Sequence, residues 1–290
     1  MLRYWLMVSL FVSMTMVSAQ AQFRPVATVA CGDEYNELQE IVKAPAAAQR
    51  IELGQRFLKK YPDSKARGVV YRQLVSALIG EKDFPQAVLV AQCALSEDPG
   101  NLTVIAEVCW LASERACNSD LSYATLAGEL GRKAIEMINN GSIPYEYNED
   151  TWPKQRENFL GGLHKSLGIV AFHLGQWQEA IEYFRTSTTM LPSDPYSYYL
   201  VAKCLYNQTA ATEKTAAKVT EKAEANEIIL LNLARALVLT EQENYQWLRS
   251  SIESEIGYLS QQMKLAKPID HYVEIVRNEL NTTLKTSPKP

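Results

Sequence analysis

The chain alternates between stretches in which apolar residues recur every three or four positions and short polar stretches that contain Gly or Pro. This recurrence predicts amphipathic helices separated by turns. It is clearest over residues 71–99 and 164–192, where a helix, a turn, a second helix and a closing proline follow one another. Alternation of strand type is confined to short stretches inside helical periods. The pattern therefore predicts an all-α protein.

The two blocks correspond to each other position by position, with a constant displacement of 93 residues. Tyr71, Leu74, Phe84, Ala87 and Pro99 of the first block correspond to His164, Leu167, Trp177, Ala180 and Pro192 of the second. A constant displacement indicates an internal repeat. Since one helix pair cannot bury its apolar face alone, such units are expected to stack.

The second block resembles the tetratricopeptide repeat (TPR) family. Leu167-Gly168, Ala180, Phe184 and Pro192 have the spacing of that family's signature. The first block departs from it at Val75, where Gly is usual, and at Ala91, where a large aromatic residue is usual. The resemblance implies a right-handed α-solenoid of antiparallel helix pairs, a TPR array, with C-terminal capping helices.

The ending of the preceding unit adds a second resemblance. Phe57 followed by Tyr61-Pro62-Asp63-Ser64 is similar to repeats of outer-membrane assembly lipoproteins of bacterial envelopes. That similarity implies an exported bacterial protein with a role in cell-envelope or secretion assembly.

With this register, a TPR-like array is expected over residues 34–245, with units at about 34–67, 68–101, 102–141, 161–194 and 195–240. Residues 246–290 are expected to form capping helices and a tail, because the last apolar face of a stack needs a cover. The segments 141–159 and 207–227 interrupt the spacing and are expected to be insertions, either functional or merely tolerated.

The N-terminus has the three-part layout of a secretory signal peptide. Arg3 is followed by an apolar run over residues 4–17 and by the small-x-small triplet Ala19-Gln20-Ala21. A signal peptide is therefore expected over residues 1–21, with a linker over 22–33 and a periplasmic or secreted product. The alternative, a membrane anchor, is disfavoured because the run is short and diluted by Ser and Thr. No membrane span is expected after cleavage.

Charge and chemistry narrow the function further. The 290 residues include 29 Lys and Arg and 33 Asp and Glu, a net charge of -4. Because nucleic-acid-binding surfaces are usually basic, no nucleic-acid partner is expected. Five cysteines cannot all pair within one chain, and none forms a C-x-x-C motif. Three histidines without a metal or nucleophile motif give no catalytic constellation, so neither an enzyme nor a cofactor is expected.

The remaining function class is recognition of a protein or peptide partner. In these repeats the first helix of each pair lines the concave face. The residues expected on that groove are Arg72, Trp110, Lys165, Phe172, Tyr199, Lys203 and Tyr206. Aromatic residues and Arg carry much of the energy of interfaces. The alternative is that these aromatic residues pack against a neighbouring repeat.

A second candidate site is the insertion at 141–159, a possible binding loop with Tyr145, Tyr147 and Trp152. Two other functions remain open. A small-molecule or glycan binder would use Trp110, Phe172, Tyr199 and Tyr206 as stacking platforms. An enzyme would use Glu149 or Asp150 beside the aromatic insertion.

Overall fold

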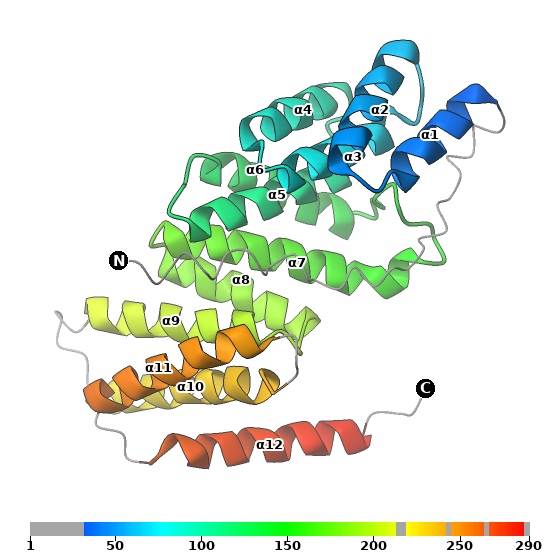
Figure 1. Ribbon diagram of the computed structural model, residues 1–290. Coiled ribbons are helices and arrows are strands. Elements are labelled where there is room, and N and C mark those ends of the chain that lie inside the picture. Colours follow the sequence, from blue (N-terminus) through cyan, green and yellow to red (C-terminus); the bar gives the residue numbers. More distant parts are fainter. Residues whose placement is uncertain (1–31, 213–218, 242–244, 264–266, 287–290) are drawn as a thin grey trace. The chain divides into compact units, whose positions relative to one another are not determined.

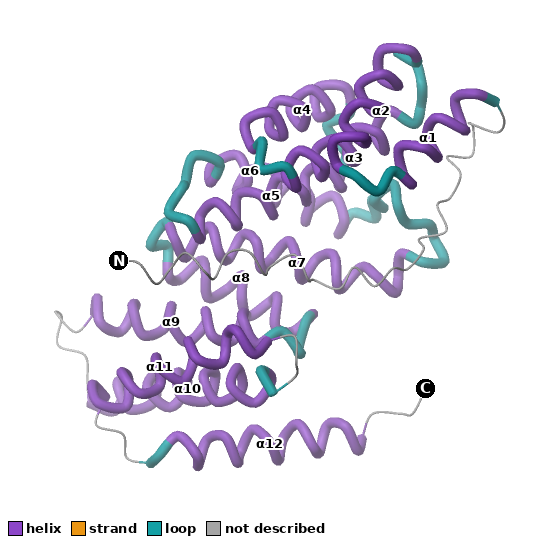
Figure 2. Tube along the Cα trace, in the orientation of Figure 1, coloured by secondary structure: helices purple, strands orange, loops and turns teal. Residues whose placement is uncertain are grey.

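Helices account for most of the computed structural model, which describes residues 32–212, 219–241, 245–263 and 267–286 (Figure 1). Within these ranges there are twelve helices and no strand (Figure 2). The prediction of an all-α protein is therefore confirmed. The predicted signal peptide, most of the predicted linker and Cys31 lie outside the described residues.

The described chain divides into two compact units, with the boundary between His173 and Leu174. This boundary falls inside the unit predicted at 161–194.

The first unit contains seven helices. They are α1 (Asp33–Lys43), α2 (Ala47–Lys60), α3 (Arg67–Gly80), α4 (Phe84–Glu97), α5 (Leu102–Cys117), α6 (Ala124–Asn139) and α7 (Trp152–His173). The odd-numbered helices are neighbours in the order α1, α3, α5 and α7. Each even-numbered helix packs against the helices that precede and follow it in the chain. The odd-numbered helices therefore form one layer, which is called the inner layer below.

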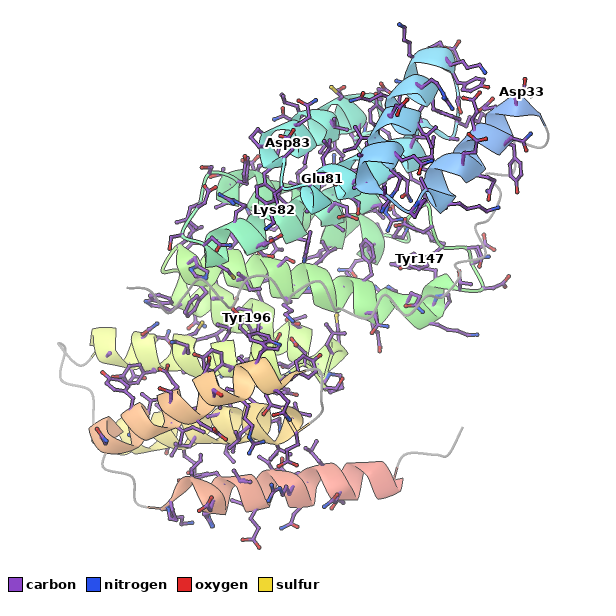
Figure 3. The ribbon with its side chains drawn as sticks, viewed as in Figure 1. Asp33, Glu81, Lys82, Asp83, Tyr147 and Tyr196 are labelled. Atoms are coloured by element: carbon purple, nitrogen blue, oxygen red, sulfur yellow. The ribbon has the colours of Figure 1, made fainter. Side chains whose placement is uncertain are left out.

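Turn and cap residues explain where several of these helices begin. Lys82 has a left-handed φ of 62° in the turn between α3 and α4, where Figure 3 labels it together with Glu81 and Asp83. The Asp83 carboxylate then accepts a hydrogen bond from the Gln86 amide at 3.3 Å. Asn101 accepts one from the Val104 amide at 3.2 Å at the start of α5. These bonds satisfy amides that have no partner in the first turn of a helix.

The inner layer is longer at α7 than the repeat spacing predicts. This helix begins at Trp152, although the corresponding unit was expected to begin at about residue 161. The Asn148 side chain accepts hydrogen bonds from the amides of Asp150, at 3.0 Å, and Thr151, at 2.8 Å. Pro153 follows at the second helical position, where its missing N–H costs no hydrogen bond. The second half of the predicted insertion is thus helical.

The second unit contains five helices within the described residues. They are α8 (Trp177–Met190), α9 (Pro195–Thr212), α10 (Val219–Leu239), α11 (Gln246–Met263) and α12 (Ile269–Thr286). Neighbouring helices are α8 and α9, α9 and α10, α10 and α11, and α10 and α12. The described residues of the predicted 207–227 insertion belong to the ends of α9 and α10.

The helices expected to cap the array, α11 and α12, pack against different faces of α10. Tyr272, Val273 and Val276 of α12 form a core cluster with Leu230 and Ala234. A second cluster joins Leu248, Ile252, Ile256 and Leu259 of α11 to α10 residues such as Ile229 and Leu233, and to Tyr198 and Ala202 of α9. Successive residues of a helix point about 100° apart, so Ile229 packs in the cluster with α11 and Leu230 packs in the cluster with α12.

Candidate functional site

The seven residues predicted to line a groove fall into two groups, one in each unit. Arg72, Trp110, Lys165 and Phe172 lie on α3, α5 and α7, the neighbouring helices of the inner layer. Tyr199, Lys203 and Tyr206 lie on α9. All seven side chains are half-buried. The structure thus places the first four on one layer of the first unit and the other three on one helix of the second.

Arg72 is the centre of a polar cluster on the inner layer. Its Nε lies 3.7 Å from Oε1 of Glu107 and 3.9 Å from Oε1 of Glu146. Glu146 also accepts a hydrogen bond from the Thr103 hydroxyl. Since Glu146 belongs to the 141–151 segment, that segment folds back onto α3 and α5. The structure therefore brings part of the predicted binding loop to part of the predicted groove.

Tyr145 gives the 141–151 segment a second contact with the helices of the first unit. Its hydroxyl donates a hydrogen bond to Oδ2 of Asp98 at 2.5 Å. A Cβ atom on Gly68 would lie 3.1 Å from the Tyr145 ring, so the absence of a side chain there permits this contact. Burial, together with the hydrogen bond to Asp98, raises the pKa of Tyr145 to about 12. Tyr145 nevertheless remains 49% exposed.

The other two residues of the predicted binding loop pack inward. Tyr147, labelled in Figure 3, lies 5.4 Å from the ring of Trp152. Phe159 completes the cluster, with ring centroids 5.7 Å from Trp152 and 6.4 Å from Tyr147. Trp152 is only 6% exposed. These aromatic residues thus join the start of α7 to the preceding segment, and Tyr145 presents the most open surface of the three.

A small cavity lies beside the Arg72 cluster. It is lined by Gly68, Val69, Arg72, Thr103, Tyr145 and Glu146, and its volume is about 10 Å³. That volume is about the minimum for a single water molecule. A sugar ring does not fit, so this cavity gives no support to the glycan-binding alternative.

Two carboxyl groups of α5 are made weaker acids by their surroundings. Burial raises the pKa of Glu107, and the nearby charge of Glu146 adds to the rise while Arg72 opposes it. Burial also raises the pKa of Glu114, against the influence of Arg115 and Lys82. Sequence reasoning missed both residues, although they lie one turn on either side of Trp110 at helical spacing.

The α9 group lies against α11. The Lys203 ammonium is 3.1 Å from Oε2 of Glu255 and 3.5 Å from the Tyr199 hydroxyl. The rings of Tyr206 and Tyr258 meet edge to face with centroids 6.4 Å apart. At the start of α9, Tyr196, labelled in Figure 3, lies 6.1 Å from the ring of Trp247. The aromatic stripe expected on a groove is therefore in contact with a helix of its own chain.

The other residues considered for catalysis or metal binding do not gather at one site. Glu149 and Asp150 are exposed at the surface. Burial lowers the pKa of His164 and of His173. Among the described residues, no three His, Cys, Asp or Glu side chains are grouped to hold a metal ion. None of the described helices is long and apolar enough to cross a membrane. Cys93, Cys109 and Cys204 are free thiols.

Sequence comparison finds no family model and no curated protein that this chain matches.

Proposed function

We propose that this protein is a non-catalytic TPR-like scaffold that binds a protein or peptide partner through the inner layer of its first unit. In this proposal the helices form antiparallel pairs in a right-handed solenoid, and the inner layer is its concave face. Support comes from the neighbour relations of the first unit, because α1, α3, α5 and α7 follow one another as the first helices of successive TPR units do.

The observation that carries the proposal is the composition of this layer. Three neighbouring helices each contribute half-buried aromatic or cationic side chains, namely Arg72 from α3, Trp110 from α5, and Lys165 and Phe172 from α7. Trp and Arg are enriched among the residues that dominate binding energy. A partially accessible set of such residues on one layer suits recognition of a partner better than it suits packing alone.

The proposed location rests on the sequence. A signal peptide over residues 1–21 would export the chain to the periplasm or the medium, and the partner would then be a component of a cell-envelope or secretion assembly. The proposal includes no cofactor and no turnover.

The experiment compares retention of partners by the mature chain, beginning at Gln22, and by two variants that each shorten one apolar side chain to Ala. Trp110→Ala removes an aromatic side chain from the inner layer. Leu89→Ala removes an apolar side chain from α4, where Leu89 is 55% exposed. Circular dichroism first checks that both variants are folded.

We expect an envelope fraction to contain a protein that the wild type and Leu89→Ala retain and Trp110→Ala loses. With that protein purified, Trp110→Ala should weaken binding by about 2 kcal/mol or more, the loss typical of a central interface residue. Equal affinity of a folded Trp110→Ala variant would contradict the proposal.

A further inference from the structure

The contacts between α9 and α11 have a regular register. They pair Tyr196 with Trp247, Lys203 with Glu255, and Tyr206 with Tyr258. The residue numbers in these pairs differ by 51, 52 and 52. Because the difference stays constant along three turns, the two helices run in the same direction, side by side. Aromatic rings form the two ends of this seam, and an ion pair lies between them.

The other helices of the second unit are joined to one another without α11. Helix α9 packs against α8 and α10, and α12 packs directly against α10 through its own core cluster. Helix α11 adds a separate stripe, in which Leu248, Ile252, Ile256 and Leu259 enter the cluster formed by α9 and α10. Its opposite side is open, with Glu253, Ser254 and Gly257 exposed. Helix α11 thus lies on the α9–α10 face. Ile269 and Leu280 of α12 pack against the same cluster, but α12 also packs directly against α10.

The α9–α10 face has the chemistry of a helix-binding groove. It offers Tyr196, Tyr199 and Tyr206 as aromatic surface, α10 aliphatic residues such as Leu233 as its floor, and the cation of Lys203. Amphipathic helices bind such grooves through anchors three or four residues apart. Helix α11 has these anchors, since Leu248, Ile252, Ile256 and Leu259 are separated by four, four and three residues. Glu255 supplies the carboxylate that meets Lys203.

We propose that α11 is an intramolecular ligand of the α9–α10 face, and that a partner helix of the same chemistry binds there by replacing it. The partner would carry an aliphatic stripe with the α11 spacing and a carboxylate directly before the third aliphatic residue. This inference rests on the proposed function as a partner-binding protein, but it concerns a different surface from the inner layer.

Attachment to the same chain gives α11 a high effective concentration at the groove. A free helix therefore binds in proportion to the fraction of molecules in which α11 is displaced. A substitution that weakens the packing of α11 against the α9–α10 face should increase that fraction and expose the groove to an added peptide.

The test uses the full mature chain and a labelled synthetic peptide with the sequence of α11. Glu255→Lys places a second cation opposite Lys203. Glu253→Lys makes the same charge change on the exposed side of α11, where Glu253 pairs with Arg249 and its side chain is 52% exposed. Fluorescence anisotropy measures peptide binding to the wild type and to both variants.

We expect Glu255→Lys to bind the peptide at least about tenfold more tightly than the wild type and Glu253→Lys do. The peptide with its own Glu255 changed to Lys should lose this gain. Equal peptide affinity for all three proteins would overturn the proposal.

Native-state hydrogen exchange of the wild type gives an independent test. Amides of α11 should exchange through an opening of lower free energy than amides of α9, α10 and α12. Equal protection of α10 and α11, or complete unfolding of Glu255→Lys, would make α11 a fixed part of the core and overturn the proposal. A wild-type mass of two chains with exchanged α11 would also contradict it, because the occupant would then be a second copy.

These outcomes are separate from those of the proposed function, since the peptide test requires no external partner. Peptide binding without any partner on the inner layer would leave the α9–α10 groove as the binding surface of the molecule. Loss of peptide binding with Trp110-dependent partner retention would remove only the role of α11.

Discussion

At the residue scale, two glutamates of the first unit experience opposite electrostatic environments. Glu107 is largely removed from water, with Arg72 the nearest cation at 3.7 Å. Glu97 accepts two hydrogen bonds from Arg67, at 2.8 and 2.6 Å, and one from the Tyr71 hydroxyl. Burial raises the pKa of Glu107, while the hydrogen bonds from Arg67 lower the pKa of Glu97. The two residues should therefore give stability contributions of opposite sign.

The raised pKa of Glu107 means that its ionisation costs stability as pH rises above the ordinary value for Glu, about 4.3. Glu107→Gln removes this cost, so the stability of the variant relative to wild type should increase from about pH 4 to about pH 7.

Because the pKa of Glu97 is lowered, its ionised carboxylate stabilises the fold at pH values above the ordinary pKa of Glu. That stability is lost as pH falls below this pKa. Glu97→Gln should therefore be destabilised at about pH 7, with the deficit shrinking only as pH falls below about 4.3, the ordinary value for Glu. Urea unfolding at several pH values measures both trends, and parallel trends would refute these assignments.

Sequence reasoning identified Arg72 and Tyr145 separately and could not bring them together. Their proximity depends on Gly68, where a side chain would meet the Tyr145 ring, and on Glu146, which meets Thr103 from a distant part of the chain. Glu107 was missed because a single acidic residue at helical spacing usually faces solvent. Its spacing relative to Arg72 and Trp110 gives no direct measure of burial.

At the element scale, Gly131 of α6 is a position where helices of the first unit approach closely. A Cβ atom there would lie 2.7 Å from Cδ2 of Leu167 and 3.1 Å from the Cys109 sulfur. Leu167 is 2% exposed and Cys109 is fully buried. Because neither side chain has free space, Gly131 allows α6 to pack against both α5 and α7.

Gly131→Ala should destabilise the protein by about 1 to 3 kcal/mol, the usual cost of overfilling a packed core. Gly162→Ala on α7 is the matched control, because a Cβ atom there meets no atom within 4 Å. That substitution should leave stability unchanged or raise it by about 0.5 to 1 kcal/mol through helix propensity. Urea unfolding of both variants measures the difference. Equal stability of the two variants would show that the helices do not approach closely at Gly131.

The existence of most helices followed from the recurrence of apolar residues, whereas several of their ends did not. The repeat spacing placed the start of a unit near residue 161, while the Asn148 cap and Pro153 begin α7 at Trp152. Both residues are present in the sequence, but the expected start of the unit rested on the repeat spacing alone. The register of α11 against α9 had no comparable local signal, because it depends on pairing across about fifty residues.

At the scale of the whole molecule, the recurrence of apolar residues was sufficient to predict an all-α chain. It also assigned Arg72, Trp110, Lys165 and Phe172 to helices that the structure makes neighbours. It could not show that Tyr199, Lys203 and Tyr206 meet α11, because helical spacing alone does not distinguish an open face from one covered by a later segment. The first unit therefore carries the proposed partner-binding surface, and the second has a groove that is already filled.

The central claim is that the inner layer of the first unit contacts a partner, and site-specific photocrosslinking in the native compartment tests it most directly. A photoreactive amino acid replaces Ser76, half-buried on α3 one turn from Arg72, or Leu89 on α4 as the control position. The account predicts a covalent adduct of defined mass from position 76, none from position 89, and loss of the adduct when Trp110→Ala is added. No adduct at position 76, or the same adduct from both positions, would contradict it.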